Sequence, residues 1–478
     1  MLWYTLAVLL VAGLIWMLWR TAQFKPKESL RLGQPRAVQL PQMPVAGKLS
    51  QLLQIPTVSY ADTSLEDRAA FSAFQDKLHA LYPGVAAHCP RLIVNDRGIV
   101  YCWQGQSSDD PRVLMAHYDV VPADANSWTR LPFSGDIADG FVHGRGALDT
   151  KCSIAASLEA AENLIAEGFQ PAQDIYFCFS SDEETAGPTA QAIIDALAAS
   201  GVRPGFVLDE GGGVSRDVLP GVSLPCAMVG VNEKGMTQLV ITATDKPGHA
   251  STPPRRTAMG RLSRAILKLE RRPWPLRLTP TLRQQIDVLG RHSRWPQRFV
   301  YANMAVLKPL VSLYAWWRGG RLNAMLRTTC AFTTAAGSSA HNVLPGQVSA
   351  VANVRIIPGE SIKSVRRRAA KLLQGKHISV QTLGGDEPSP TSDTDDHKWS
   401  MLCDAIQEIW PEALACPDTM LGATDATRYS AICQNVYRFS GRETSPEQSA
   451  LVHGHDERIS TAQLAKMVAF YEALIIRL

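Results

Sequence analysis

The chain has 478 residues, of which 46% are hydrophobic and 19% charged, and its formal net charge is +4 at pH 7. This composition excludes a disordered or fibrous protein, and the length exceeds what one hydrophobic core usually supports, so we expect two domains. The small net charge and the lack of a long Lys/Arg block argue against a nucleic-acid partner.

The chain begins with an apolar, uncharged segment. The run from Met1 to Trp19 has no charged side chain and carries aromatic residues near both ends, namely Trp3, Tyr4, Trp16 and Trp19. Its length matches a bilayer core of about 30 Å, and Trp and Tyr are typical of membrane interfaces. We therefore predict a transmembrane anchor over residues 1–20. A cleaved signal peptide is the alternative, but no basic segment precedes the run, and bulky side chains stand where a cleavage site needs small ones.

Charge and cysteine patterns bear on which side of the membrane the remaining chain lies. The first basic residues all follow the apolar segment, and positive charge favours the cytoplasmic side. The nine cysteines are scattered without close pairs, so we interpret them as buried reduced thiols, which are typical of the cytoplasm. Both patterns favour a cytoplasmic location.

The rest of the chain divides into a tether and one interrupted domain. Residues 21–46 mix prolines with charges and show no sustained period, which predicts a tether. Over residues 47–230, short apolar strands alternate with helices such as 154–167 and 189–199. This alternation is typical of an α/β fold with a mostly parallel sheet flanked by helices. Residues 353–478 are expected to complete the same domain.

Residues 231–352 are predicted to form a second, inserted domain. A strand is expected at 238–244 and a helix at 258–269, and the domain closes near a strand at 353–357. Within it, residues 271–326 form an irregular stretch that contains many aromatic and Arg residues. We interpret this stretch as an insertion that packs on its own domain; a substrate-access wall or a membrane contact is the alternative.

The first candidate metal ligands follow a predicted strand. His117-Tyr-Asp119 comes directly after the apolar run 113–116, so both side chains should emerge at the C-terminal end of a strand, where ligands bind in open α/β sheets. A neutral imidazole is a good zinc ligand, and a carboxylate two residues away can orient it. Asp149 follows a Gly-Arg-Gly turn and precedes a predicted helix, so it could bridge two cations or simply cap the helix.

Three acidic residues follow another predicted strand. Asp182, Glu183 and Glu184 come after the apolar run 175–180, and carboxylates so close together repel one another unless a cation lies between them. One of the three can bind a metal while a neighbour acts as general base on a water molecule. A solvated acidic turn is the alternative interpretation.

Two further segments supply ligand types that suit zinc. Asp209 and Glu210 end the next apolar run, so acidic residues again stand at a strand terminus. Near the C-terminus, His453-Gly-His455-Asp-Glu457 adds imidazoles. Together these His and carboxylate groups form a set appropriate to zinc.

These motifs, in this order, resemble the di-zinc aminoacylase and carboxypeptidase family that includes carboxypeptidase G2, the acetylornithine and succinyl-diaminopimelate deacylases and carboxypeptidase S. The likeness runs from about Lys48 to the C-terminus. Met325-Leu-Arg-Thr-Thr329 and Asn342-Val-Leu-Pro345 point to the carboxypeptidase S branch, which also contains N-fatty-acyl-amino-acid synthase/hydrolases. The resemblance implies a catalytic domain interrupted by an α+β lid and dimerisation domain, and therefore a homodimer.

The resemblance also implies two zinc ions per chain, with Co²⁺ or Mn²⁺ as other candidates. It assigns Asp149 as the bridge between both ions, Asp119 as the orienting partner of a ligand, and Glu183 as the general base. Ligands of single ions follow from the same likeness: the first ion is bound by His117 and Asp209, and the second by Glu184 and His453.

Substrate contacts are implied outside the metal ligands. His249, in the lid, is expected to reach a neighbouring active site and polarise the scissile carbonyl, and Asn342 and Arg428 are expected to hold a terminal carboxylate. The sequence departs from the family at Asp425, which the family more often separates from its Arg by a single residue, and at Cys152, where relatives carry Gly or another small residue.

The expected reaction is zinc-dependent hydrolysis of an amide bond next to a free carboxylate. The substrate is a peptide that loses its C-terminal residue, as in a metallo-carboxypeptidase, or alternatively an amino acid that loses an N-acyl chain. A binding protein that kept the fold without turnover is a more remote alternative. Such relatives usually lack a metal ligand or the general base, whereas this sequence has every expected ligand and Glu183.

Overall fold

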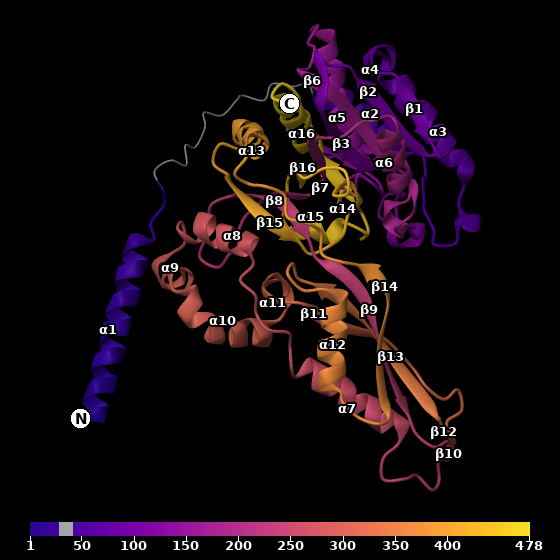
Figure 1. Cartoon of the computed structure of the whole chain (residues 1–478). Coiled ribbons are helices and arrows are strands. Elements are labelled where there is room, and N and C mark those ends of the chain that lie inside the picture. The colour runs from indigo at the N-terminus through magenta and orange to yellow at the C-terminus, as the bar shows by residue number, and fades with distance from the viewer. Residues whose placement is uncertain (28–41) are drawn as a thin grey trace.

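The structure is a computed structural model, and it describes residues 1–27 and 42–478. An eight-stranded sheet forms the upper part of the molecule (Figure 1). It is mixed, with parallel pairing among its central strands and antiparallel strands towards both ends. In spatial order its strands are β1 (Arg91–Val94), β2 (Gly98–Trp103), β6 (Gln173–Ser180), β3 (Ser107–His117), β7 (Phe206–Ser215), β16 (Val436–Glu443), β8 (Cys226–Glu233) and β15 (Leu414–Met420).

Helices cover both faces of this sheet. Because both faces are covered, central strands are buried without alternation, as in β3, where the last seven residues are all buried. One face packs against α2 (Gln42–Leu53), α3 (Arg68–Leu81), α4 (Pro83–His88), α5 (Lys151–Ala166), α13 (His397–Ile409) and α16 (Thr461–Ile475). The other packs against α6 (Thr189–Ala199) and α14 (Ala426–Tyr429). The predicted α/β fold class is confirmed.

A second, antiparallel sheet extends away from the first (Figure 1). Its strands in order are β11 (Thr329–Ala336), β13 (Gln347–Ile356), β9 (Gly235–Thr244) and β14 (Ile378–Asp386). Buried and more exposed residues alternate along β9 and β13, so one face packs on α7 (Ala258–Glu270) and α12 (Ile362–Leu372). The short strands β10 (Gly248–His249) and β12 (Val343–Leu344) pair at its tip.

This sheet corrects the expected return to the first domain at residue 353. That position lies inside β13, and β14, which pairs with β9, extends the antiparallel sheet to Asp386. The error arose because β13 looks like any other apolar strand, and only its pairing partners show to which sheet it belongs.

The stretch 271–326, expected to be irregular, is mostly helical. It contains α8 (Pro280–Gly290), α9 (Trp295–Ala302), α10 (Met304–Arg318) and α11 (Gly320–Leu326). Proline at the first or second position of α8 and α9 starts these helices rather than breaking them, since the first helical N–H groups have no intrahelical partner. Their apolar faces form two small cores below β15.

The N-terminal segment forms one helix, α1 (Leu2–Gln23), which ends three residues beyond the predicted anchor. It is long and apolar enough to cross a membrane, and a signal sequence would pass the same test. Of the predicted tether, residues 28–41 lie outside the described residues, and residues 42–46 belong to α2.

Two smaller elements complete the frame around the site. The helix α15 (Pro446–Leu451) precedes His453. After His453, β17 (Arg458–Ser460) pairs with β5 (Phe141–His143), which also pairs with β4 (Ile137–Ala138), so the three form a small sheet.

Candidate metal centre

The predicted metal ligands gather at the carboxyl edge of the central parallel strands. His117 ends β3, and Glu183 and Glu184 lie in the turn after β6. The acidic pair Asp209 and Glu210 belongs to β7. These strands are neighbours in the order β6, β3, β7, so their ends meet at one edge of the sheet.

Asp149 lies at the middle of this cluster. One of its carboxylate oxygens, Oδ1, is 3.1 Å from Nε2 of His117, and the other, Oδ2, is 3.1 Å from Nε2 of His453. Nε2 of His117 also lies 3.1 Å from Oε1 of Glu210, and Nε2 of His453 lies 3.0 Å from Oε2 of Glu184. Asp149 therefore stands between two pairs of side chains, His117 with Glu210 and His453 with Glu184. This is the arrangement expected of a ligand that bridges two cations.

The structure places the carboxylate of Glu210, rather than that of the predicted ligand Asp209, beside His117. The Asp209 carboxylate accepts hydrogen bonds from the backbone N–H groups of Glu210, at 2.8 Å, and Ala426, at 3.1 Å, whereas the Glu210 carboxylate faces His117. Successive side chains of a strand point to opposite faces, so a ligand assignment shifted by one residue selects the wrong face.

A matched pair of variants tests which of the two carboxylates binds metal. Glu210→Gln is expected to lower the metal content, because a carboxylate beside His117 is lost. Asp209→Asn is expected to keep the metal content but to lower the free energy of unfolding by about 1–3 kcal/mol, since a buried group bonded to two N–H groups is disturbed. Elemental analysis and thermal unfolding measure both effects. The opposite pattern, with metal lost only from Asp209→Asn, would restore Asp209 as a ligand.

Asp119 connects two parts of the cluster. Its Oδ1 lies 3.3 Å from Nδ1 of His117, and its two oxygens accept the backbone N–H groups of Glu183 and Glu184, both at 3.1 Å. Ser59 donates a further hydrogen bond of 2.7 Å to Oδ2. Asp119 therefore orients the imidazole and fixes the acidic turn at the same time. Ser59 was not predicted, since it lies 58 residues before His117 in an unremarkable loop.

A buried ion pair supports Asp149 from behind. The Glu457 carboxylate accepts the backbone N–H groups of Leu148, at 2.7 Å, and Asp149, at 3.1 Å, and pairs with Arg145 at 2.8 Å. The side chains of Glu457 and Arg145 are almost fully buried. Glu457 was visible in the sequence four residues after His453, but its role behind Asp149 was not predicted.

The acids of the cluster influence one another strongly. Burial raises the pKa of the Glu183 carboxyl well above its ordinary value, against the attraction of the His117 ring, and the nearby carboxylates of Glu210 and Asp425 raise it further. Oε2 of Glu183 is 3.9 Å from Nε2 of His117, so Glu183 lies at the edge of the cluster. Divalent cations among these oxygens would relieve the repulsion.

The cluster opens into a cleft with a volume of about 820 Å³. Its lining includes Glu183, Asp149, Glu184 and His453 together with the cationic side chains of Lys234, Arg355 and Arg428. Arg428 donates a 3.0 Å hydrogen bond to the carbonyl of Ala186, next to the acidic turn. The wider spacing from Asp425 to Arg428 therefore still places this guanidinium at the cleft.

His249 and Asn342 lie elsewhere. Both belong to the tip of the antiparallel sheet, where the backbone N–H of Ala250 donates to the carbonyl of Asn342 at 3.0 Å (Figure 1). The His249 ring is exposed and contacts the Ser251 hydroxyl at 2.7 Å. Neither residue is among the described residues that line the cleft of the same chain. Their expected contacts with substrate stay a prediction.

The α/β sheet, the cluster at its carboxyl edge and the cleft above it define a metallohydrolase with room for two metal ions. Residues 113–477 match peptidase family M20/M25/M40, and the chain belongs to this family. The resemblance to di-metal peptidases and aminoacylases is thereby confirmed, as is the prediction of an enzyme that acts on peptide or linear amide bonds.

Curated relatives cover most of the chain. It is 32% identical to a probable carboxypeptidase S-like 2 of Dictyostelium discoideum, over 90% of this chain and 84% of the relative. It is 31% identical to the human N-fatty-acyl-amino acid synthase/hydrolase PM20D1, over 89% of this chain and 86% of the relative.

Solved structures share the fold at lower identity. An M20 family metallo-carboxypeptidase of Sulfolobus solfataricus superposes with a TM-score of 0.63 at 16% identity, covering 90% of this chain and 98% of that chain. A dinuclear metal-binding M20 peptidase of Bacillus subtilis gives a TM-score of 0.55 at 13% identity, covering 91% of this chain and 97% of that chain.

Proposed function

We propose that the chain is a zinc-dependent hydrolase that cleaves an amide bond next to a free carboxylate, in the manner of a metallo-carboxypeptidase. The observation that carries this proposal is the shared position of Asp149, with one oxygen towards His117 and the other towards His453. Imidazole and carboxylate ligands suit zinc, and Co²⁺ or Mn²⁺ can occupy similar sites. His117 and Glu210 would hold one ion, and His453 and Glu184 the other.

Apart from the metal ions, protein side chains carry out proton transfer and position the reacting groups. Bound divalent cations supply Lewis acidity, which activates water and polarises the amide carbonyl. The Glu183 carboxylate accepts a proton from the attacking water and then delivers it to the nitrogen of the leaving amine. Asp119 holds the backbone of Glu183 and the ring of His117, so the base keeps its position relative to the cluster.

Substrate binding involves a cationic wall and a second copy of the chain. In the cleft, Arg428 is positioned to pair with the substrate carboxylate. His249 and Asn342 lie together at the exposed tip of the antiparallel sheet, so they serve a substrate only if a homodimer brings the tip of one chain to the cleft of the other. In that arrangement His249 stabilises the developing oxyanion.

A second substrate class has its own support. The similarity to the N-fatty-acyl-amino acid synthase/hydrolase PM20D1 and the exposed apolar side chains of residues 271–326 favour N-acyl amino acids with a long acyl chain. In both classes the scissile amide stands beside a carboxylate, so the same cleft chemistry serves either.

The N-terminal helix is proposed to anchor the enzyme, with its active site on the cytoplasmic side. The apolar window of α1 is not buried against the rest of the chain, and Trp residues stand near both ends of the helix. A mature protein that begins after residue 23 would contradict the anchor.

A substrate panel tests the proposed activity. Full-length protein in detergent is incubated with dipeptides and with matched N-acetyl and N-lauroyl amino acids, with and without a chelator. We expect release of a free amino acid that the chelator abolishes and added zinc restores. Faster turnover of dipeptides supports a carboxypeptidase, and a preference for N-lauroyl substrates supports a hydrolase of N-acyl amino acids. Turnover unaffected by complete metal removal would refute the proposal.

A further inference from the structure

The helical insertion 271–326 is strongly basic. It contains nine arginines and one lysine but a single acidic residue, Asp287, so its net charge of +9 exceeds the +4 of the whole chain. None of these basic residues lies in the metal centre. A segment with such an excess of basic residues attracts anionic partners, including the headgroups of acidic lipids.

The helix α10 carries an exposed apolar stripe within this basic insertion. Val306, Leu310, Leu313 and Trp317 are spaced by four, three and four residues, so they lie on one side of the helix, and their exposed fractions are 51%, 66%, 60% and 77%. On the opposite side, Met304 and Ala315 are buried in the insertion. The helix is therefore apolar on both sides, and its outer side lacks cover in the described chain.

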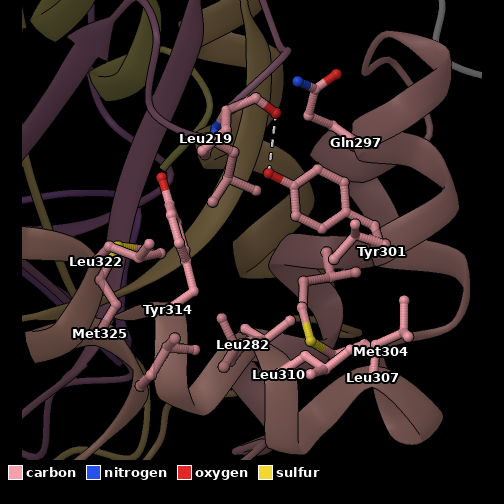
Figure 2. A pocket seen from close by; sticks show the side chains of 15 residues that line it. Leu219, Leu282, Gln297, Tyr301, Met304, Leu307, Leu310, Tyr314, Leu322 and Met325 are labelled. Carbon is pink, nitrogen blue, oxygen red and sulfur yellow. Dashed lines mark hydrogen bonds between the residues drawn. The ribbon is translucent and has the colours of Figure 1, made fainter. Parts of the chain in front are cut away.

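An apolar pocket adjoins the same helix (Figure 2). Its volume is about 390 Å³, and Leu310 and Tyr314 belong both to its lining and to the exposed surface, so the pocket reaches the surface beside the stripe. The Tyr301 hydroxyl donates a 2.9 Å hydrogen bond to the carbonyl of Pro220, which leaves its ring as apolar wall. Such a hollow fits an aliphatic chain.

The end of α1 packs on this insertion (Figure 1). The Asn303 side-chain amide, at the start of α10, donates to the carbonyl of Met17 and to the Thr21 hydroxyl, both at 3.1 Å. The Arg291 guanidinium lies over the ring of Phe24. Residues 17–24 include the last turns of α1 and the end of its apolar segment, so a bilayer crossed by α1 has its surface near α9 and the start of α10.

We infer that α9 and α10 lie on the surface of an anionic lipid bilayer, with the outer stripe of α10 inserted at the boundary between headgroups and acyl chains. Two independent observations favour lipid over a protein partner: the contact with the only described helix that is long enough to span a membrane, and the excess of Arg in the insertion that carries the stripe. The inference rests on the proposed membrane anchor α1 and does not depend on the proposed catalytic activity.

Site-specific fluorescence in lipid nanodiscs tests the inference. Full-length Leu313→Cys is labelled with a polarity-sensitive dye, and Leu92→Cys is the matched control, because Leu92 is 51% exposed on β1, at the far edge of the large sheet (Figure 1). Labelled protein without either change gives the background from the native cysteines. In phosphatidylglycerol nanodiscs we expect a blue shift and quenching by brominated lipid at position 313, and neither effect at position 92.

Two outcomes would overturn the inference. A label at position 313 as water-exposed as the label at position 92 would show that the stripe does not contact lipid. A blue-shifted label that brominated lipid does not quench, together with cross-linking between copies, would assign the stripe to a protein interface. Unchanged circular dichroism and metal content of Leu313→Cys establish that the labelled protein is folded.

Discussion

Glu183→Gln is expected to lower kcat by about 10²- to 10⁴-fold, which is the usual contribution of a general acid–base group. Glutamine has the same shape but cannot accept a proton from water. The Glu183 carboxylate stands at the edge of the cluster, 3.9 Å from Nε2 of His117, and its backbone is held by Asp119 independently of its side chain. Metal content and KM should therefore stay near those of the unchanged protein.

The neighbouring residue provides the matched control for this variant. The Glu184 carboxylate contacts His453 at 3.0 Å, so Glu184→Gln is expected to lower the metal content as well as kcat. Elemental analysis and steady-state kinetics on both variants separate the two roles. Near-normal turnover of Glu183→Gln with normal metal content would remove Glu183 from the mechanism, and loss of metal from that variant would make it a ligand.

Asp149→Asn is expected to abolish activity by weakening both metal sites at once. Each carboxylate oxygen of Asp149 faces a different imidazole, and the asparagine amide replaces one of these oxygens with an NH₂ group that cannot bind a cation. Because ligands that bind only the folded state raise stability, we also expect the increase in Tm on adding zinc to disappear. Elemental analysis and thermal unfolding with and without zinc measure these effects.

Asp139→Asn is the control for the loss of one negative charge. The Asp139 side chain is 82% exposed and pairs only at the surface with Arg130, at 3.3 Å. This variant should keep the activity, the metal content and the zinc-dependent rise in Tm. If Asp149→Asn retained two metal ions and measurable turnover, Asp149 would not be the bridging ligand.

Much of the candidate site could be predicted because its residues follow apolar runs. His117, Glu183 and Glu184 each come shortly after a predicted strand, and parallel strands bring their carboxyl ends to one edge of a sheet. The choice between Asp209 and Glu210 could not be made in this way. It depends on which face of β7 meets His117, and a one-residue shift reverses the face.

Other features depend on contacts between distant parts of the chain. Glu457 reaches the backbone of Asp149 across 308 residues, and Asn303 reaches the end of α1 across 286 residues. No local sequence pattern predicts either contact. The helices of the insertion were missed for a related reason, since their apolar residues face two small cores and the surface rather than one regular side.

The sequence by itself determined the α/β class, the family and most of the ligand types, because these depend on hydrophobic period, strand ends and motif order along the chain. The tertiary structure decided that Glu210 rather than Asp209 faces His117, that β13 and β14 belong to the antiparallel sheet, and that the insertion packs against α1. The physical reason is that side-chain direction and strand pairing are settled by packing between segments far apart in sequence, which local spacing does not encode.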